Sequence, residues 1–499
     1  MSDVRSEARS EGIGEPERDL RFAIIGAGMS GILSAIKLRE AGLTDFTIYE
    51  KADRLGGTWR ENTYPGIGCD VPSHLYCYSF EPNAEWSHRF SPGGEIQNYF
   101  EDVARKYAVE KSIRFGEEIT RCEFREGRWR LQTSTGRHDE ADFVIAATGV
   151  LHHPQYPDIE GLDDFEGALF HSARWDHTVP LEGQRIGVIG TGSTATQIVS
   201  GVVDRVDKLS LFQRTAQWIM PQENPEYSEA EKDAFRRDPE LMHKLRRDVS
   251  HLFAEGFANA VVDAESEQMK NIEAMCLENL EGNVRDPELR EKLRPEYRAA
   301  CKRLVISDDF YDAIQKPNAE VVTEAIERVE ARGLRTRDGR LHELDILVLA
   351  TGFRVDRFLR PMEVVGRDGL RLDEAWAERP VAYLSISTPG FPNLFMLNGP
   401  NGPVGNFSLI EVAELQFDYI LQLVDLVRSG RCKAVDASQE ATERFDIERT
   451  EAAKKTVWMT GCRSWYLDDR GIPAVWPWTY DHYRNEMATP NPDHYTLTP

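Results

Sequence analysis

Two short glycine-rich runs contain residues that could bind a pyrophosphate group. The first is GAGMSG at 26–31 and the second is GTGSTA at 190–195. In such a turn the first glycine allows a tight bend, the second lets backbone approach the phosphates, and the third small residue lets the helix pack on the strand. The runs therefore predict two dinucleotide sites, one at Gly26, Gly28 and Gly31 and the other at Gly190, Gly192, Ser193 and Thr194.

The two sites carry opposite charges at the position that meets the ribose. Glu50 ends the apolar run at 46–49, whereas Arg214 and Thr215 follow the apolar run at 208–212. An acid accepts hydrogen bonds from a ribose 2′-hydroxyl and repels a 2′-phosphate, while an arginine pairs with that phosphate. We therefore predict FAD in the first site and NADPH in the second; the alternative is that Arg214 is an ordinary surface residue.

Apolar strands and helices must position both glycine runs. Strands are predicted at 21–25, 46–49, 186–189 and 208–212, and two more, FVIAATG at 143–149 and ILVLATG at 346–352, end in the same Ala-Thr-Gly. From about 222 to 300, charge is dense, apolar residues recur at helical offsets and prolines interrupt the pattern. The predicted fold is α/β, with two Rossmann-like dinucleotide-binding domains and a mostly helical insertion in the second.

The domain boundaries follow from these patterns. We expect a disordered tail at 1–19 and a first, FAD-binding domain at 20–154 and 386–499. The second, NADPH-binding domain is expected at 155–385, with the helical insertion at 222–300.

Composition disfavours several classes of function. The formal net charge of -24 argues against nucleic acid and anionic membranes as partners, because both attract basic surfaces. No apolar run is long enough to span a bilayer, and the N-terminal stretch lacks the apolar core of a secretory signal. The seven cysteines are widely spaced, without metal-ligand spacing or a Cys-x-x-Cys pair. We therefore expect free thiols, no metal and a cytoplasmic location.

Three further stretches carry residue types suited to chemistry. FEGALFHSARWD at 165–176 lies between the glycine runs and has neither a helical period nor strand alternation. GGTW at 56–59, with Tyr-Pro-Gly at 64–66 and Asp70 behind it, is too rich in glycine and proline for a helix or central strand and predicts a tight loop against a flat ligand. Cys-Lys-Arg at 301–303 follows the insertion. Taken alone, the first stretch could be an ordered linker, the second a surface turn and the third a solvated Lys-Arg pair.

The first two of these stretches resemble the patterns of type I Baeyer-Villiger monooxygenases. The pattern F-x-G-x-x-x-H-x-x-x-W-D is matched by Phe165, Gly167, His171, Trp175 and Asp176. The pattern G-G-x-W-x4-[FY]-P-[GM]-x3-D is matched from residue 56 to residue 70. With the glycine runs, the resemblance spans about residues 20 to 480 in the family's motif order.

The resemblance implies a function and a set of site residues. NADPH would reduce FAD, reduced flavin would take up O₂ as a C4a-(hydro)peroxide, and the deprotonated peroxide would convert a ketone into an ester or lactone. Arg303, paired with Asp70, would stabilise the anions, and the 165–176 segment would couple nucleotide binding to domain rotation. The residues implied at the flavin are Gly57, Thr58, Trp59, Asp70 and Tyr76; Lys302 would bind the 2′-phosphate, and Trp465 is the substrate-site candidate.

Two other functions remain open from the sequence. A flavin-containing monooxygenase that oxidises N or S atoms would share both nucleotide motifs but needs no Arg303–Asp70 pair, and an uncoupled NADPH oxidase would release peroxide without product. The stretch 468–473 departs from the pattern of better-known cyclic-ketone members, which leaves the substrate open. The partners expected are a ketone, with sulfides as a second substrate class, and O₂, in a monomer or small homo-oligomer.

Overall fold

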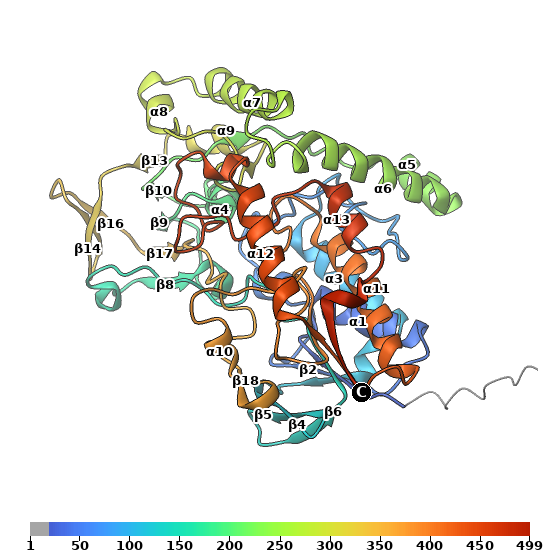
Figure 1. Ribbon diagram of the computed structural model, residues 1–499. Helices are drawn as coiled ribbons and strands as arrows, with labels where there is room; N and C mark the ends of the chain where they lie inside the picture. The colour runs from blue at the N-terminus through green and yellow to red at the C-terminus, as the bar shows by residue number, and fades with distance from the viewer. Residues whose placement is uncertain (1–18) are drawn as a thin grey trace, which may run out of the picture.

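The computed structural model describes residues 19–499, so the tail predicted at 1–19 lies, apart from Asp19, outside the described residues. Two five-stranded parallel sheets form its framework. In Figure 1 the helices α5 (Glu229–Arg237), α6 (Pro239–Phe253) and α7 (Glu267–Asn283) lie at one end of the molecule. A small sheet containing β5 (Arg128–Thr133) lies at the opposite end.

The first parallel sheet has the order β19-β7-β1-β2-β3. Its central strand β1 pairs in register with both neighbours, so Ile25 lies beside Tyr49 and Ala146. The ends that carry Gly26, Glu50 and the first Ala-Thr-Gly therefore meet at one edge. The strands are β1 (Phe22–Ile25), β2 (Phe46–Glu50), β3 (Ile113–Phe115), β7 (Phe143–Ala146) and β19 (Leu394–Met396).

Helices α1 (Met29–Glu40), α3 (Gly93–Lys106) and α11 (Leu409–Arg428) share a core with this sheet. Eight of the twelve residues of α1 are buried, on more than one face of the helix, because the sheet covers one side and α11 another. The first nucleotide turn therefore stands on a rigid, dry support.

A second, four-stranded sheet packs on the other face of the same strands. It has the order β18-β4-β5-β6 and shares a core with Ala23, Tyr49 and Val144. Strand β18 comes from the stretch predicted as the second domain, yet it pairs with Arg121–Glu123 of β4. The new strands are β4 (Ile119–Arg125), β6 (His138–Ala141) and β18 (Glu363–Val365).

The second parallel sheet has the order β13-β10-β9-β17-β8. Helix α4 (Ser193–Val202) follows β9, as the second glycine run predicts. Strand β8 is a correction to the sequence analysis, because a third of the 165–176 segment forms the parallel edge strand beside β17 and not irregular linker. The strands are β8 (Ala168–His171), β9 (Arg185–Ile189), β10 (Lys208–Phe212), β13 (Ala319–Val322) and β17 (Ile346–Leu349).

An antiparallel sheet and a short strand pair are attached to this second sheet. The antiparallel sheet consists of β14 (Ile326–Glu330), β15 (Gly333–Thr336) and β16 (Leu341–Glu343). Strand β11 (Ile219–Met220) pairs with β12 (Val305–Ile306) on either side of the insertion. The insertion therefore leaves and returns at adjacent points.

The insertion is helical, as predicted, and its prolines begin helices. Asp238 and Asp286 cap α6 and α8 (Pro287–Lys292), each with proline in the first helical position, where a missing N–H costs nothing. A capping box formed by Ser228 and Glu231 begins α5. A short π-helix at Ala254–Ala258 follows α6.

The C-terminal segment returns to the first sheet and then crosses toward the insertion. It contains α10 (Leu372–Ala375), β20 (Ala434–Ala437), α12 (Gln439–Ala453), α13 (Tyr480–Glu486) and β21 (Tyr495–Thr498). Between α12 and α13 lies a loop that is fixed by a disulfide between Cys301 and Cys462. The expectation that all seven cysteines are free thiols is therefore wrong. The error arises because sequence spacing says nothing of two cysteines that meet across 161 residues.

No helix from residue 19 onward is long and apolar enough to cross a membrane.

Candidate active site

The first glycine turn is packed so closely that side chains are excluded. A Cβ on Gly31 would lie 1.9 Å from the carbonyl oxygen of Gly26, and Gly26 itself has a φ of +101°. A Cβ on Gly57 would lie 3.1 Å from the Cα of Gly28. The two glycine segments thus meet backbone to backbone at the N-terminus of α1, where free N–H groups suit a pyrophosphate.

Glu50 is buried at the end of β2 and its carboxylate is held in place. It accepts hydrogen bonds from the N–H groups of Ala27 at 2.8 Å and Ala52 at 2.9 Å, and Arg60 lies 3.1 Å away. A carboxylate offers about four lone-pair positions, so a ribose hydroxyl can still donate to it. The tight glycine backbone and this oriented acid fit the adenosine diphosphate part of FAD.

A one-turn helix, α2 (Thr58–Glu61), follows Gly57. The prediction that this stretch excludes helix is wrong for these four residues. The Asn62 side chain donates to the carbonyl of Thr58 at 2.9 Å and closes the turn. The turn aims Trp59 at Tyr76, to whose hydroxyl the indole N–H donates at 3.2 Å, with the rings edge to face at 5.6 Å. Both implied flavin contacts are therefore brought together, and both are half-buried.

Arg303 and Asp70 form the ion pair that the resemblance implies. The guanidinium Nη2 lies 2.6 Å from Asp70 Oδ2, although the residues come from different parts of the chain. The charge of Asp70 raises the pKa of Arg303 further, so the guanidinium stays cationic. Burial raises the pKa of the neighbouring Cys69, which therefore remains a neutral thiol.

Tyr466 is a third member of this group. Burial raises its pKa to about 12, so the hydroxyl stays protonated, and its ring packs in the same apolar cluster as Leu304, the residue after Arg303. The ring of Trp465 lies against that of Tyr466 at 4.3 Å and is 38% exposed. The substrate-site candidate thus lies one residue from a side chain that packs next to the segment carrying Arg303.

The second glycine turn has an open side. A Cβ on Gly190 would lie 2.2 Å from the carbonyl oxygen of Ala350, whereas a Cβ on Gly192 would meet nothing within 4 Å. The N-terminus of α4, with Ser193 and Thr194, therefore has room for phosphates next to Gly192. This arrangement fits a second dinucleotide.

Two cations, Lys302 and Arg214, influence each other electrostatically. Burial lowers the pKa of Lys302, and the charge of Arg214 lowers it further, so the two side chains share one electrostatic environment. Lys302 Nζ lies 4.7 Å from the centre of the Tyr297 ring. Thr191 donates to the carbonyl of Thr215 at 2.8 Å and fixes the loop that carries Arg214. A cluster of this kind suits the doubly charged 2′-phosphate of NADPH.

The 165–176 segment forms an ordered edge and not a flexible link. His171 is buried; its Nε2 donates to the carbonyl of Gly352 at 3.0 Å and its Nδ1 accepts from the Ala173 N–H at 3.1 Å. Burial lowers the pKa of His171, so the ring is neutral. It therefore ties β8 to the second Ala-Thr-Gly.

The other members of the segment support this edge. A Cβ on Gly167 would lie 2.6 Å from the ring of Phe165, so only glycine fits there. Trp175 packs edge to face on Phe170 at 4.9 Å. Asp176 is exposed and accepts from the N–H of Thr178 at 2.9 Å.

A chain of ion pairs that the sequence analysis missed connects this segment to the first site. Arg174 pairs with Glu61, Glu61 pairs with Arg60 at 2.6 Å, and Arg60 pairs with Glu50. Arg174 and Glu61 lie inside the two motifs that were recognised, but they occupy variable positions of those patterns. Opposite charge at such positions is the only sequence signal that could have pointed to them.

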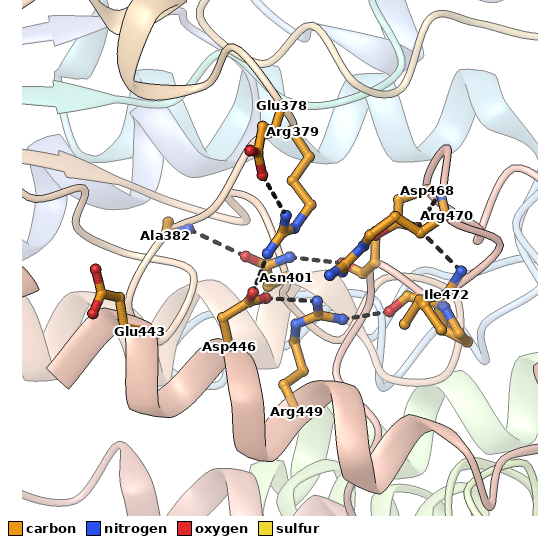
Figure 2. A network of polar contacts seen from close by, with 12 residues as sticks. Glu378, Arg379, Ala382, Asn401, Glu443, Asp446, Arg449, Asp468, Arg470 and Ile472 are labelled. Carbon is orange, nitrogen blue, oxygen red and sulfur yellow. Dashed lines mark hydrogen bonds and ion pairs between the residues drawn. The ribbon is translucent and has the colours of Figure 1, made fainter. Parts of the chain in front are cut away.

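Figure 2 shows the contacts that hold the end of the loop carrying Trp465. Arg449 of α12 is fully buried and donates to the carbonyl of Pro473 and, at 2.7 Å, to Asp446. Asn401 donates to the carbonyl of Ala474 at 3.1 Å. The loop that carries the candidate Trp465 therefore rests on a buried polar support, which sequence analysis also missed because a lone arginine in a charged helix usually faces solvent.

Within residues 19–499 no group of three or more His, Cys, Asp or Glu side chains is arranged to hold a metal ion.

Comparisons with known proteins agree with this geometry. A family model described as flavin-binding monooxygenase-like matches residues 19–361. A Baeyer-Villiger monooxygenase of Streptomyces coelicolor is 41% identical over 475 residues, covering 94% of this chain and 90% of its own. An uncharacterized monooxygenase of Mycobacterium tuberculosis is 49% identical over 475 residues, which cover 95% of this chain and 95% of its own.

A solved structure leads to the same family. Cyclohexanone monooxygenase from Rhodococcus sp. Phi1 bound to NADP⁺ superposes with a TM-score of 0.86 at 30% identity, covering 96% of this chain and 99% of that one. The shared architecture covers both parallel sheets and the helical insertion. The chain belongs to the flavin-binding monooxygenase-like family, and within it to the Baeyer-Villiger monooxygenases, which use FAD and NADPH.

Proposed function

We propose that Arg303 is the residue with which this enzyme stabilises negative charge during oxygen insertion. The reaction converts a ketone, O₂, NADPH and a proton into an ester or lactone, water and NADP⁺. Bound FAD supplies the transfer of electrons from NADPH to O₂ and the activation of oxygen. The observation that carries the proposal is the 2.6 Å pair between Arg303 and Asp70.

Each member of this group has a separate task. A carbonyl oxygen becomes an anion when a nucleophile adds to the carbonyl carbon, and the fixed guanidinium of Arg303 offers several donors to it. Asp70 occupies Nη2 and so fixes the orientation of the remaining donors. Because Arg303 already carries its charge, it needs no proton transfer to act.

The remaining site residues bind and position the cofactors. We propose that Glu50 accepts from the ribose of FAD, and that Trp59 and Tyr76 lie against its ring system. Arg214 and Lys302 would bind the 2′-phosphate of NADPH. The glycines of both turns leave space for pyrophosphate. The 165–176 segment, through His171, would couple NADPH binding to rotation of the second domain.

Several coarser features are part of the same proposal. We keep the domain boundaries at 20–154 with 386–499 and at 155–385, except that β18 packs with the first body. A cytoplasmic location is proposed because NADPH is regenerated there. A ketone is the proposed substrate, sulfides a second class, and the enzyme would act as a monomer or small homo-oligomer.

The function is tested by following NADPH consumption and product formation together across linear, cyclic and aryl ketones. Ester or lactone formed in step with NADPH is the expected result. Arg303→Ala should still be reduced by NADPH but lose product about 100-fold to 1,000-fold, since one fixed donor to an oxyanion is removed. Arg303→Lys is the matched control for charge without the planar fork. Normal ester yield from Arg303→Ala would remove Arg303 from the reaction.

A further inference from the structure

The single disulfide joins two segments that each carry a site residue. Cys301 and Cys462 are bonded although 161 residues separate them. Cys301 directly precedes Lys302 and Arg303, and Cys462 lies three positions before Trp465. Both flanking segments are irregular and have no strand ladder to fix them against each other. The bond is therefore a direct covalent link between the ion-pair segment and the substrate-site loop.

The other end of that loop is held by contacts that do not depend on redox state. Arg449 reaches the carbonyl of Pro473, and Asn401 reaches that of Ala474 (Figure 2). The Asp468 side chain accepts from the N–H of Ile472 at 3.1 Å and closes a turn between them. The loop 462–474 thus has a polar anchor at its 473–474 end and a covalent anchor at Cys462, and between them Tyr466 packs in a buried apolar cluster with Trp458 and Leu304. Of these, only the covalent anchor depends on redox state.

Tyr466 lies between the two anchors and responds to both. Its carbonyl accepts from the N–H of Ala474 at 2.7 Å, which ties it to the polar anchor. Its ring is pressed over Gly405, where a Cβ would lie 2.2 Å from the Tyr466 hydroxyl. Its hydroxyl is electrostatically coupled to Arg303, which lies two residues beyond Cys301. Loss of the sulfur link would therefore loosen Tyr466 and Trp465 relative to Arg303.

We propose that Cys301 and Cys462 form a reversible redox site that sets the position of the substrate-site loop. Disulfides in cytoplasmic proteins are usually redox-sensing and not structural. A dithiol form and a disulfide form of the enzyme would then differ in loop order without any change in the cofactor sites. This site goes beyond the proposed function and uses from it only the cytoplasmic location.

The exposure of the two sulfurs assigns their order of reaction. Cys462 is 7% exposed and is flanked by exposed Gly461 and Arg463, whereas Cys301 is fully buried. The Cys462 thiol releases its proton, and the thiolate attacks a hydroperoxide such as H₂O₂, giving a sulfenic acid and a hydroxide that takes up the released proton to become one water. The Cys301 thiol then displaces the hydroxyl as a second water and forms the S–S bond. A dithiol reductant reverses the change by supplying two electrons and two protons.

We expect the disulfide form and the dithiol form to differ in how easily water reaches the site beside the ion pair. In the disulfide form the loop is fixed at both ends, and Tyr466 and Trp465 stay beside the ion pair. In the dithiol form the 462 end opens, exposes the peptide bond after Arg463 and admits water to the site. We expect the dithiol enzyme to have a raised ketone KM and to consume more NADPH per ester formed.

The first test needs neither a substrate nor a variant. Holoenzyme is treated with H₂O₂ or with a dithiol, the reagent is removed, and the protein is denatured and alkylated for intact-mass measurement. Seven cysteines less the two in the bond leaves five, so five alkyl groups are expected after peroxide and seven after dithiol. Seven in both samples would overturn the proposal, because no bond then forms. Five in both would overturn it as well, because the bond would be permanent.

The second test follows the loop itself. Trypsin should cleave after exposed Arg463 about tenfold faster in the dithiol form, since local opening governs proteolysis. Cys462→Ser and Cys301→Ser should show the fast rate under both conditions. Cys276→Ser, a buried cysteine in the same apolar cluster as Trp458 and Tyr466, is the matched control and should still respond to dithiol.

The outcomes separate this site from the proposed function. A response to dithiol that persists in Cys462→Ser would overturn the redox assignment, whatever the enzyme oxidises. A switch in mass and proteolysis without ester formation would support the redox site while contradicting the oxygen-insertion chemistry. If either serine variant fails to fold, the wild-type mass and proteolysis measurements still decide the matter.

Discussion

The preference for NADPH over NADH should depend on Lys302 and Arg214. The charge of Arg214 lowers the pKa of Lys302, and Thr215, the residue after Arg214, accepts a hydrogen bond from Thr191 of the second glycine turn. NADH differs from NADPH only by the missing 2′-phosphate. Replacing either cation with alanine should therefore reduce kcat/KM for NADPH and leave kcat/KM for NADH nearly unchanged.

The size of the effect follows from burial. A hydrogen bond to a charged group contributes about 1.5–3 kcal/mol, and each ~1.4 kcal/mol is tenfold in an equilibrium constant. Arg214 is exposed, so its loss should cost about 1.5 kcal/mol, or roughly 10-fold. Lys302 is half-buried, so its loss should cost about 2–3 kcal/mol, or roughly 30-fold to 150-fold. The double variant should fall short of the product because the two cations share one phosphate.

The pH dependence has a definite sign. The pKa of Lys302 lies below that of an ordinary lysine because of burial and of Arg214. Its charge, and with it the preference for NADPH, is present at low pH and is lost as pH rises through that lowered pKa. Lys302→Arg should keep the preference to higher pH, since guanidinium does not titrate there.

The assay is the ratio of the two kcat/KM values on each variant, measured at one ionic strength. Arg205→Ala removes an exposed arginine that pairs with Glu182 outside the site, and serves as the control for net charge. Equal losses with NADPH and NADH would refute the assignment of the 2′-phosphate. A similar loss in Arg205→Ala would show that long-range charge, and not contact, sets the preference.

Three further predictions concern the scaffold. His171→Ala should leave the Ala173 N–H without a partner and remove one of the two hydrogen bonds that the Gly352 carbonyl accepts, lower stability by about 1–3 kcal/mol and raise NADPH consumed per ester; full coupling in that variant would contradict the linker role. Arg174→Ala should lower stability by no more than about 1 kcal/mol, because Arg174 is exposed. The variant should nevertheless form less ester per NADPH consumed, and an unchanged ratio would exclude a role for Arg174 in coupling the two sites. Burial raises the pKa of Asp436 to about 6, so this carboxyl stabilises the fold when protonated, and that stability is lost as pH rises from about 4 to about 6. Asp436→Asn should therefore raise the melting temperature at pH 7.5 and not at pH 4, as thermal unfolding at both values would show.

The parts of the fold that sequence could predict are those set by local geometry. The apolar strands at β1 and β9, the glycines after them and the caps at Asp238 and Asp286 act within a few residues of each other. Their patterns therefore predicted both nucleotide turns and the helical insertion. Pairing of Arg303 with Asp70 spans 233 residues and came from resemblance to a family, not from any local pattern.

The failures arise where distant contacts override a local pattern. Residues 168–171 lack alternation because β8 packs against β17 with its last residues buried on both faces. Thr58–Glu61 forms a helical turn between glycines because Asn62 and the chain beyond close it. Cys301 and Cys462 looked unpaired because only the folded chain brings the two segments together.

These missed contacts have a common physical consequence. Glu50 is held by Arg60, and the chain of charges continues through Glu61 to Arg174 in the segment that His171 orders. A shift of the 165–176 segment would therefore change the charge around Glu50 at the first nucleotide site. Such a shift is what the proposed coupling to NADPH binding at the second site would produce. At the other side of the enzyme, the sulfur link places the ion-pair segment and the substrate loop under one constraint. Neither connection lies in a residue that contacts the reacting atoms, so coupling between the cofactor sites and the substrate site depends on pairs that no local motif contains.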